Sequence, residues 1–346
     1  MGAENRKSLI AALEQELKAR VLTLVTGDRQ GMETRIAPDI LPLVAEHLAS
    51  IGASKRLALF LYTPGGDSIA GWGLVNLLRE YCEHLLVVVP FRSLSCGTLV
   101  AFGADEIVMG KHGLLSPIDP SVSSPFNPQV PGAQPGIVNF LPVSVEDMVG
   151  FLDLARNEGG LKSEESLVEI IKLLANHVNP LALGAVYRAR EQNSSLAKKL
   201  LSRHEKDNKK VERIVKRLTQ ELPTHSYLIG RQEAKDDLGL SITEPSASIE
   251  KLIWNIYQEY AAWLRFNQPA STELDLGTEP QKQVRYERAA VESLHNGSLS
   301  QHVFVTDKVL LKIKIVPPGL QAPVDQVGER ILYQGWLAQT DGEASK

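Results

Sequence analysis

A serine hydroxyl, Ser95, stands where a predicted strand gives way to a predicted helix. An apolar run over residues 85–89 precedes it, and a second apolar pattern with Leu99 and Val100 follows. The turn would present the hydroxyl beside the first amide N–H groups of a helix, which favour negative charge. This arrangement suits a nucleophile whose attack on a carbonyl group creates an oxyanion. The alternative is a serine that only caps a core helix.

Two glycines after an earlier strand are the second feature with chemical potential. Residues 57–63 form a short, continuous apolar run typical of a buried strand, and Gly65 and Gly66 follow it closely. Glycine can turn its amide N–H into a pocket because no Cβ stands in the way. Backbone donors at this strand end could therefore hold the oxyanion that attack by Ser95 creates. The alternative is a plain tight turn.

The order of these motifs resembles that of the serine dehydrogenase proteinase family, which has the Clp protease/crotonase fold and is related to signal peptide peptidases. The resemblance is dense from about residue 57 to residue 122 and thin elsewhere. It is carried by residues 62–67, 95–101, 104–110 and 116–120, and later by residues 224–225 and 233–240. It implies a serine peptidase with Ser95 as nucleophile and an oxyanion hole made by Gly65 or Gly66 and by Cys96.

Two alternatives are open for the general base. Clp proteases carry a histidine near the position of Asp119 and an acidic residue near that of His225, so the resemblance implies that the two residue types have exchanged places. Catalytic triads are defined by geometry rather than by chain order, so Ser95, His225 and Asp119 could still form one. The other route is a Ser–Lys dyad, as in signal peptide peptidases. Lys162, which follows a Gly-Gly pair, is its candidate.

Composition narrows the classes of function. The 346 residues are 43% hydrophobic and 23% charged, as in globular proteins, and their net charge of −4 gives no argument for a nucleic-acid or anionic-membrane partner. The two cysteines, Cys82 and Cys96, provide neither a disulfide framework nor the spacing of a metal site. We therefore expect no metal and no cofactor. Cys96 is expected to be a small core residue rather than a nucleophile.

Location and partners follow from the sequence and from the resemblance. Acidic residues interrupt the apolar positions at the start of the chain, and no apolar run is long enough for a membrane span. We therefore expect a cytoplasmic protein without a signal peptide. The resemblance implies protein or peptide substrates, membrane proteins among them, and a homo-oligomer. An amphipathic helix over residues 4–20 is expected to pack on a neighbouring subunit or on the protein's own core.

Strands alternate with helices in the first third of the chain, which indicates a mostly parallel sheet. Together with the resemblance, the fold class is α/β: a Clp/crotonase-like ββα superhelix with helical insertions over residues 144–222 and a small C-terminal β appendage. We expect a serine peptidase domain over residues 1–266, a linker over residues 267–283, and a β-hairpin appendage with a tail over residues 284–346. Asn296 and Gly297 are the hairpin signal.

Two other classes of function are compatible with the same fold. A crotonase-type acyl-CoA enzyme also stabilises an oxyanion with two backbone amides, although it usually lacks a serine at this point, and no adenine-binding signature is conspicuous here. A catalytically silent oligomeric scaffold would keep the fold without the chemistry. Labelling of Ser95 by a fluorophosphonate is expected to distinguish a serine hydrolase from both.

Overall fold

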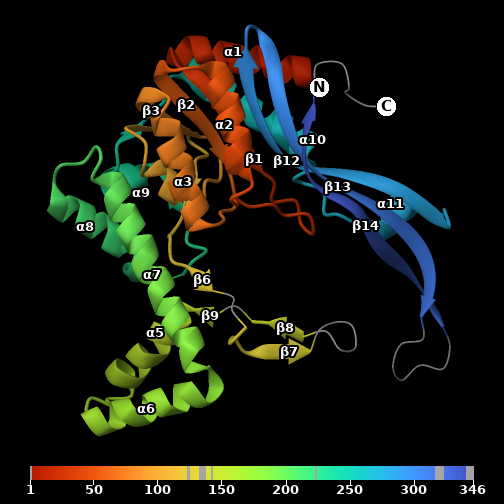
Figure 1. Ribbon diagram of the computed structural model, residues 1–346. Coiled ribbons are helices and arrows are strands. Elements are labelled where there is room, and N and C mark those ends of the chain that lie inside the picture. Colours follow the sequence, from red (N-terminus) through yellow and green to blue (C-terminus); the bar gives the residue numbers. More distant parts are fainter. Residues whose placement is uncertain are drawn as a thin grey trace. The chain divides into compact units, whose positions relative to one another are not determined.

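The computed structural model describes residues 2–122, 125–131, 138–141, 143–222, 224–315 and 323–339. The chain divides into two compact units. One unit contains residues 1–115 together with residues 229–346, and the other contains residues 116–228. Figure 1 shows the helices and strands of each unit.

A mixed sheet forms the centre of the first unit, and its described strands have the order β11-β4-β3-β2-β1-β12-β13-β14. β1 (Arg20–Thr26), β2 (Ser54–Tyr62), β3 (Cys82–Val89) and β4 (Glu106–Met109) are parallel neighbours, which confirms the prediction from the alternating strands and helices. β11 (Ile242–Thr243) extends the parallel part beside β4. The later residues of each of the first four strands are buried, as their continuous apolar runs indicate.

Helices connect and cover these strands (Figure 1). The connecting helices are α2 (Ile40–Ile51), α3 (Ser68–Arg79) and the short α4 (Cys96–Ala101). Two further helices, α1 (Ala3–Leu17) and α10 (Ala247–Trp263), pack together and share a core with apolar side chains of the sheet. The short elements β5 (Leu114–Leu115), β10 (Ile229–Gly230) and α9 (Arg231–Asp236) complete this part of the unit.

A buried ion pair anchors α1 within the chain. The Arg6 guanidinium donates to the Glu292 carboxylate at 2.9 and 3.1 Å, and the two side chains are 4% and 0% exposed. The Tyr260 hydroxyl also donates to Glu292. Removing such partners from a buried carboxylate is strongly destabilising. Of the two arrangements that the sequence left open for this helix, the structure therefore shows packing on the protein's own core.

The predicted C-terminal appendage is part of the main sheet. β12 (Gln281–His295) pairs antiparallel with β1, so that residues 289–293 lie opposite residues 22–26. β13 (Ser298–Ile315) and β14 (Val324–Gln339) continue the sheet, each antiparallel to its neighbour. This differs from the sequence-based division, because pairing between distant segments leaves no local signal in the sequence.

Two further features of this region can be compared with the prediction. Asn296 and Gly297 have φ values of 48° and 79° between β12 and β13, which confirms the predicted hairpin turn. The predicted linker over residues 267–283 instead contains the short helix α11 (Thr272–Leu276) and the first residues of β12. A serine cap explains the helix, since Ser271 Oγ accepts a hydrogen bond from Leu274 N–H. The last residues of the predicted tail, 340–346, lie outside the described part of the chain.

The second unit is mainly helical, as the sequence predicts for residues 144–222. Its helices are α5 (Val145–Asp153), α6 (Glu164–His177), α7 (Pro180–Leu201) and α8 (Asn208–Lys216), with π-helical turns η1 (Leu154–Glu158) and η2 (Arg217–Glu221). Short antiparallel pairs join β6 (Ser121–Val122) to β9 (Val143–Ser144) and β7 (Gln129–Pro131) to β8 (Val138–Phe140). Across the described residues of both units, no helix has the length and apolarity needed to cross a bilayer.

A pair of histidines, the buried His47 and the partly buried His302, links α2 to the antiparallel strands. His47 is 1% exposed, and its ring nitrogens lie 2.7 Å from Ser293 Oγ and 3.0 Å from His302 Nδ1. Burial, and secondarily the neighbouring His302, lowers the pKa of His47 to about 4. Burial also lowers the pKa of His302, and the Glu46 carboxylate, 3.5 Å away, opposes that shift.

We predict that the free energy of unfolding falls as the pH drops from about 6.5 toward about 4. The unfolded chain binds a proton at His47 near the upper limit, whereas the folded chain binds it only near the lower one. Stability from this group is therefore complete above the window and is lost within it, by roughly 3 kcal/mol. Urea titrations at a series of pH values measure the effect. His47→Gln should flatten the curve, and an unchanged pH dependence would contradict the assignment.

Candidate active site

Ser95 lies in a strained turn between β3 and α4. Its backbone has φ 50° and ψ −109°, a region that residues with a Cβ rarely occupy. Leu94 N–H donates to Thr63 O, and Leu99 N–H donates to Ser95 O, both at 3.0 Å. These bonds hold the turn on the segment that follows β2 and on the helix α4. Such strain persists only where the surroundings impose it, and it is typical of a nucleophile at a strand-to-helix turn.

The Gly65–Gly66 turn lies directly against Ser95. The two glycines have φ values of 122° and 151°, which side chains disfavour. A Cβ built on Gly65 would lie 3.0 Å from the Cβ of Ser95 and 3.5 Å from its Oγ. Both the backbone conformation and the close approach therefore require glycine, and the structure brings together these two sequence motifs.

A segment around Ile36 fixes the backbone of the glycine turn. Ile36 N–H donates to Gly65 O at 2.9 Å, and Asp67 N–H donates to Ile36 O at 2.8 Å. A Cβ on Gly66 would lie 2.1 Å from Ile36 O, so any side chain would displace one of the two segments. The sequence analysis did not identify Ile36, because a lone apolar residue in a polar loop carries no distinguishing pattern.

The amide groups near Ser95 differ in what they can still bind. Gly65 N–H donates to Thr63 Oγ1 at 3.0 Å, and that hydroxyl is buried beside Thr26, whose own hydroxyl donates to it at 2.7 Å. Within the described residues, the N–H groups of Gly66 and Cys96 donate to no acceptor. Of the donors predicted for the oxyanion hole, these two are therefore the available ones.

Cys96 can contribute its backbone N–H but not its thiol. The residue is 2% exposed, and its Sγ donates to Asp67 O at 3.1 Å. Burial, and secondarily the charge of Asp67, raises the pKa of the thiol to about 12. A thiol that stays protonated at neutral pH is a poor nucleophile. The prediction that Cys96 is a core residue is thus confirmed.

Asp119 and His225, predicted as the acid and base of a triad, are in contact within residues 116–228. His225 Nδ1 lies 2.9 Å from Asp119 Oδ1, and the two side chains are 47% and 4% exposed. An ionised carboxylate can only accept hydrogen bonds, so it favours the tautomer with the proton on Nδ1. Nε2 is then the basic nitrogen, which is the arrangement of a histidine in a catalytic triad.

The chain next to Asp119 is anchored on the helices of its own unit. Asn193 Nδ2, from α7, donates to Ile118 O at 2.6 Å, and Ile118 N–H donates to Leu218 O at 3.0 Å. Asn193 is 5% exposed, so it is a buried polar group, and this carbonyl accepts one of its hydrogen bonds. The sequence analysis missed Asn193, because an asparagine inside a helix looks like a surface residue until its distant partner is known.

Lys162, the alternative base, is exposed in the segment between η1 and α6. A lysine that serves as a catalytic base is typically desolvated, and Lys162 is not. In the described residues, no group of three or more histidine, cysteine, aspartate or glutamate side chains is placed to hold a metal ion.

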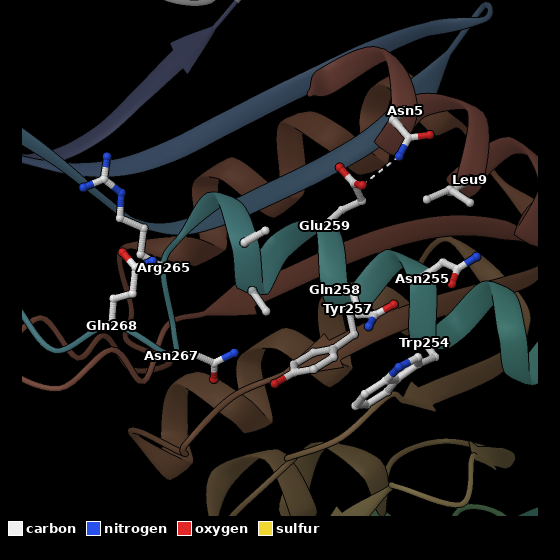
Figure 2. A pocket seen from close by; sticks show the side chains of 12 residues that line it. Asn5, Leu9, Trp254, Asn255, Tyr257, Gln258, Glu259, Arg265, Asn267 and Gln268 are labelled. Atoms are coloured by element: carbon white, nitrogen blue, oxygen red, sulfur yellow. Dashed lines mark hydrogen bonds between the residues drawn. The ribbon is translucent and has the colours of Figure 1, made fainter. Parts of the chain in front are cut away.

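An open pocket of about 760 Å³ lies beside α10 and the start of α1 (Figure 2). Its wall includes the side chains of Trp254 and Gln258 and the buried Glu259, which accepts a hydrogen bond from Asn5 at 2.7 Å. None of the site residues predicted from the sequence is among the described residues that line this pocket.

Comparison with known families agrees with the motifs. Residues 43–133 match the family model of the ClpP-like SDH-type serine proteinases. The resemblance inferred from the sequence is therefore confirmed over this segment, which contains Ser95 and both glycines. The mixed α/β architecture fits a ClpP-like fold.

Two curated relatives are uncharacterised proteins of Methanocaldococcus jannaschii. The first is 29% identical over 191 residues, which are 54% of this chain and 54% of the relative. The second is 36% identical over 64 residues, which are 18% of this chain and 22% of the relative. The chain thus spans about half of one relative and about a fifth of the other. Among solved structures, a mutant of a membrane-bound stomatin-specific protease matches with 17% identity and a TM-score of 0.24, covering 36% of this chain and 60% of that one. A match with so low a score carries no argument.

We predict that Gly66→Ala slows the reaction of Ser95 with a fluorophosphonate at least about a hundredfold, because displacing the turn removes an oxyanion donor. Gly184→Ala on α7 is the matched control, since the nearest atom to its new Cβ would be 3.8 Å away. Intact-protein mass spectrometry over time measures the labelling. A Gly66→Ala variant that reacts as fast as the parent would show that this turn does not serve Ser95.

Proposed function

We propose that this chain, which contains a ClpP-like SDH-type serine proteinase segment over residues 43–133, is a serine peptidase that acts through an acyl-enzyme on Ser95. The observation that carries the proposal is the close approach of Gly65, the first residue of the Gly65–Gly66 turn, to the strained Ser95. A serine that only capped a core helix would need neither the strained backbone nor a glycine packed against it. Crowding of this kind is instead expected where backbone donors must face a reacting oxygen.

In the proposed mechanism, Ser95 Oγ attacks the carbonyl carbon of the scissile peptide bond. The carbonyl oxygen becomes an oxyanion and accepts hydrogen bonds from the N–H groups of Gly66 and Cys96. His225 Nε2 takes the hydroxyl proton and passes it to the leaving amine, and water then hydrolyses the acyl-enzyme. Asp119 Oδ1, which lies 2.9 Å from His225 Nδ1, accepts a hydrogen bond from Nδ1–H during the reaction and stabilises the imidazolium.

The family match also supports protein or peptide substrates. The ββα superhelix, the homo-oligomer, the cytoplasmic location and the membrane-protein substrates stay predictions from the sequence. A crotonase-type acyl-CoA enzyme could use the same backbone donors, and a silent scaffold would use none. Reaction at Ser95 distinguishes these alternatives from a peptidase.

We predict that a fluorophosphonate labels the parent protein at Ser95 and that Ser95→Ala abolishes both labelling and peptide cleavage. The variant should keep its fold, because alanine at this position removes only the hydroxyl oxygen. Ser93→Ala, two residues earlier at a fully buried position, is the matched control. Peptide mapping locates the label, and circular dichroism compares the folds. Cleavage by Ser95→Ala at the parental rate would contradict the proposal, and turnover of a CoA ester without labelling would favour the crotonase reading.

We predict that His225→Ala and Asp119→Asn each lower the rate of peptide cleavage at least about a hundredfold, the usual minimum for loss of general-base help. His177→Ala, an exposed histidine on α6, is the control and should leave the rate unchanged. The parental rate should fall on acidification, because a protonated imidazole cannot accept the serine proton. A large loss in Lys162→Ala, with His225→Ala near the parental rate, would instead establish a Ser–Lys dyad.

A further inference from the structure

A strap, which we define as residues 27–39, links β12 to the glycine turn. At one end, Gly27 N–H donates to Arg288 O at 3.0 Å, and Thr34 Oγ1 donates to the same carbonyl at 3.1 Å. A Cβ on Gly27 would lie 2.4 Å from Arg288 O, so the strap and β12 are in direct backbone contact. At the other end, Ile36 holds the backbone on both sides of Gly66. The strap thus connects the antiparallel strands to the glycine turn through backbone hydrogen bonds at both ends.

The Arg288 side chain reaches back over the same strap. Its Nε donates to Met32 O at 3.0 Å, and its Nη2 donates to Glu33 O at 2.5 Å. Its Nη1 donates to Thr306 Oγ1 on β13 at 2.9 Å and to Gln334 Oε1 on β14 at 3.3 Å. The planar guanidinium therefore holds two consecutive carbonyls of the strap against three strands, which the single ammonium of a lysine could not reproduce.

The partners of Arg288 are unusual for a half-buried cation. Within the described residues, its hydrogen bonds go to carbonyl, hydroxyl and amide oxygens, and it forms no ion pair with a carboxylate. Burial lowers the pKa of the guanidinium, and only the nearby charge of Glu33 opposes the shift. Burying a cation without an ion-pair partner costs free energy. We therefore attribute the presence of Arg288 to the strap geometry that its hydrogen bonds impose, and not to a contribution to folding stability.

Packing of two buried side chains, Met32 and Ile36, holds the strap only in part. A cavity of about 240 Å³ lies between residues 33–39 and the antiparallel strands, with Phe304 and Trp336 on its far wall. Side chains that border a cavity lose contacts on that side. Hydrogen bonds from the antiparallel strands add to this hold: Arg288 donates to Met32 O and Glu33 O, and Trp336 Nε1 donates to Asp39 Oδ2 at 3.0 Å.

We propose that Arg288 is a positioning residue for the reaction at Ser95: it holds the strap whose Ile36 fixes the Gly66 N–H toward the oxyanion. The inference rests on the proposed function. It gives the β12–β14 strands, which lie outside the family match, a role in catalysis at a site to which they contribute no reacting group.

The test compares Arg288→Gln with Arg285→Gln on the same strand. Arg285 donates from Nε and Nη2 to the Asp307 carboxylate, both at 2.7 Å, and makes no described contact with the strap. The control thus removes two strong bonds from the hairpin while leaving residues 27–39 untouched. Two measurements are made on each full-length variant: hydrogen exchange of peptides covering residues 33–39 and 62–70, and inhibition by a peptide boronate.

The expected result is specific to Arg288→Gln. Exchange in both peptides should become at least about tenfold faster, because the strap opens locally. Affinity for the boronate, whose oxygen mimics the oxyanion, should fall at least about tenfold, with a smaller change in KM for a peptide substrate. Arg285→Gln should change neither, although both variants should lower Tm.

Equal effects in the two variants, or parental behaviour of Arg288→Gln, would overturn the inference. Failure of the proposed function would look different: the boronate would not bind the parent protein at all. In that case there would be no oxyanion site for Arg288 to position, and the inference would fail together with the proposed function. Hydrogen exchange would still show whether Arg288 holds the glycine turn.

Discussion

The backbone of Gly66 lies so close to that of Ile36 that no Cβ fits between them, and the geometry of the site depends on this contact. A Cβ would be 2.1 Å from Ile36 O. The two hydrogen bonds of Ile36 hold the peptide groups on each side of Gly66. The direction of the Gly66 N–H bond is therefore set by backbone contacts alone. A donor fixed in this way needs no reorganisation when negative charge develops beside it.

The hydroxyl of Thr63 determines which glycine N–H group is available to bind an oxyanion. Because Gly65 N–H donates to Thr63 Oγ1, the choice that the sequence left open between the two glycines is narrowed to Gly66. Cys96 supplies the other available N–H, and its buried thiol, with a pKa raised to about 12, stays out of the chemistry. The proposed nucleophile Ser95 would therefore use the N–H groups of Gly66 and Cys96 as its two backbone donors.

Local sequence patterns were sufficient for part of this account and not for the rest. Continuous apolar runs predicted the parallel strands, and the Gly-Gly and Ser-x-Gly motifs predicted both turns because each depends on residues adjacent in the chain. The pairing of β12 with β1, the hold of Arg288 on the strap and the bond of Asn193 to Ile118 join distant residues. Such contacts leave no periodicity or motif, so only the structure could identify them.

The most direct test of the central claim is a crystal structure of the protein with a peptide boronate bound covalently to Ser95. The account predicts one boronate oxygen within about 2.7–3.1 Å of both the Gly66 and the Cys96 amide nitrogens, the distances expected of oxyanion-hole donors. Gly65 N–H should still donate to Thr63. A boronate oxygen that points to solvent, or that binds Gly65 instead of Gly66, would contradict the account.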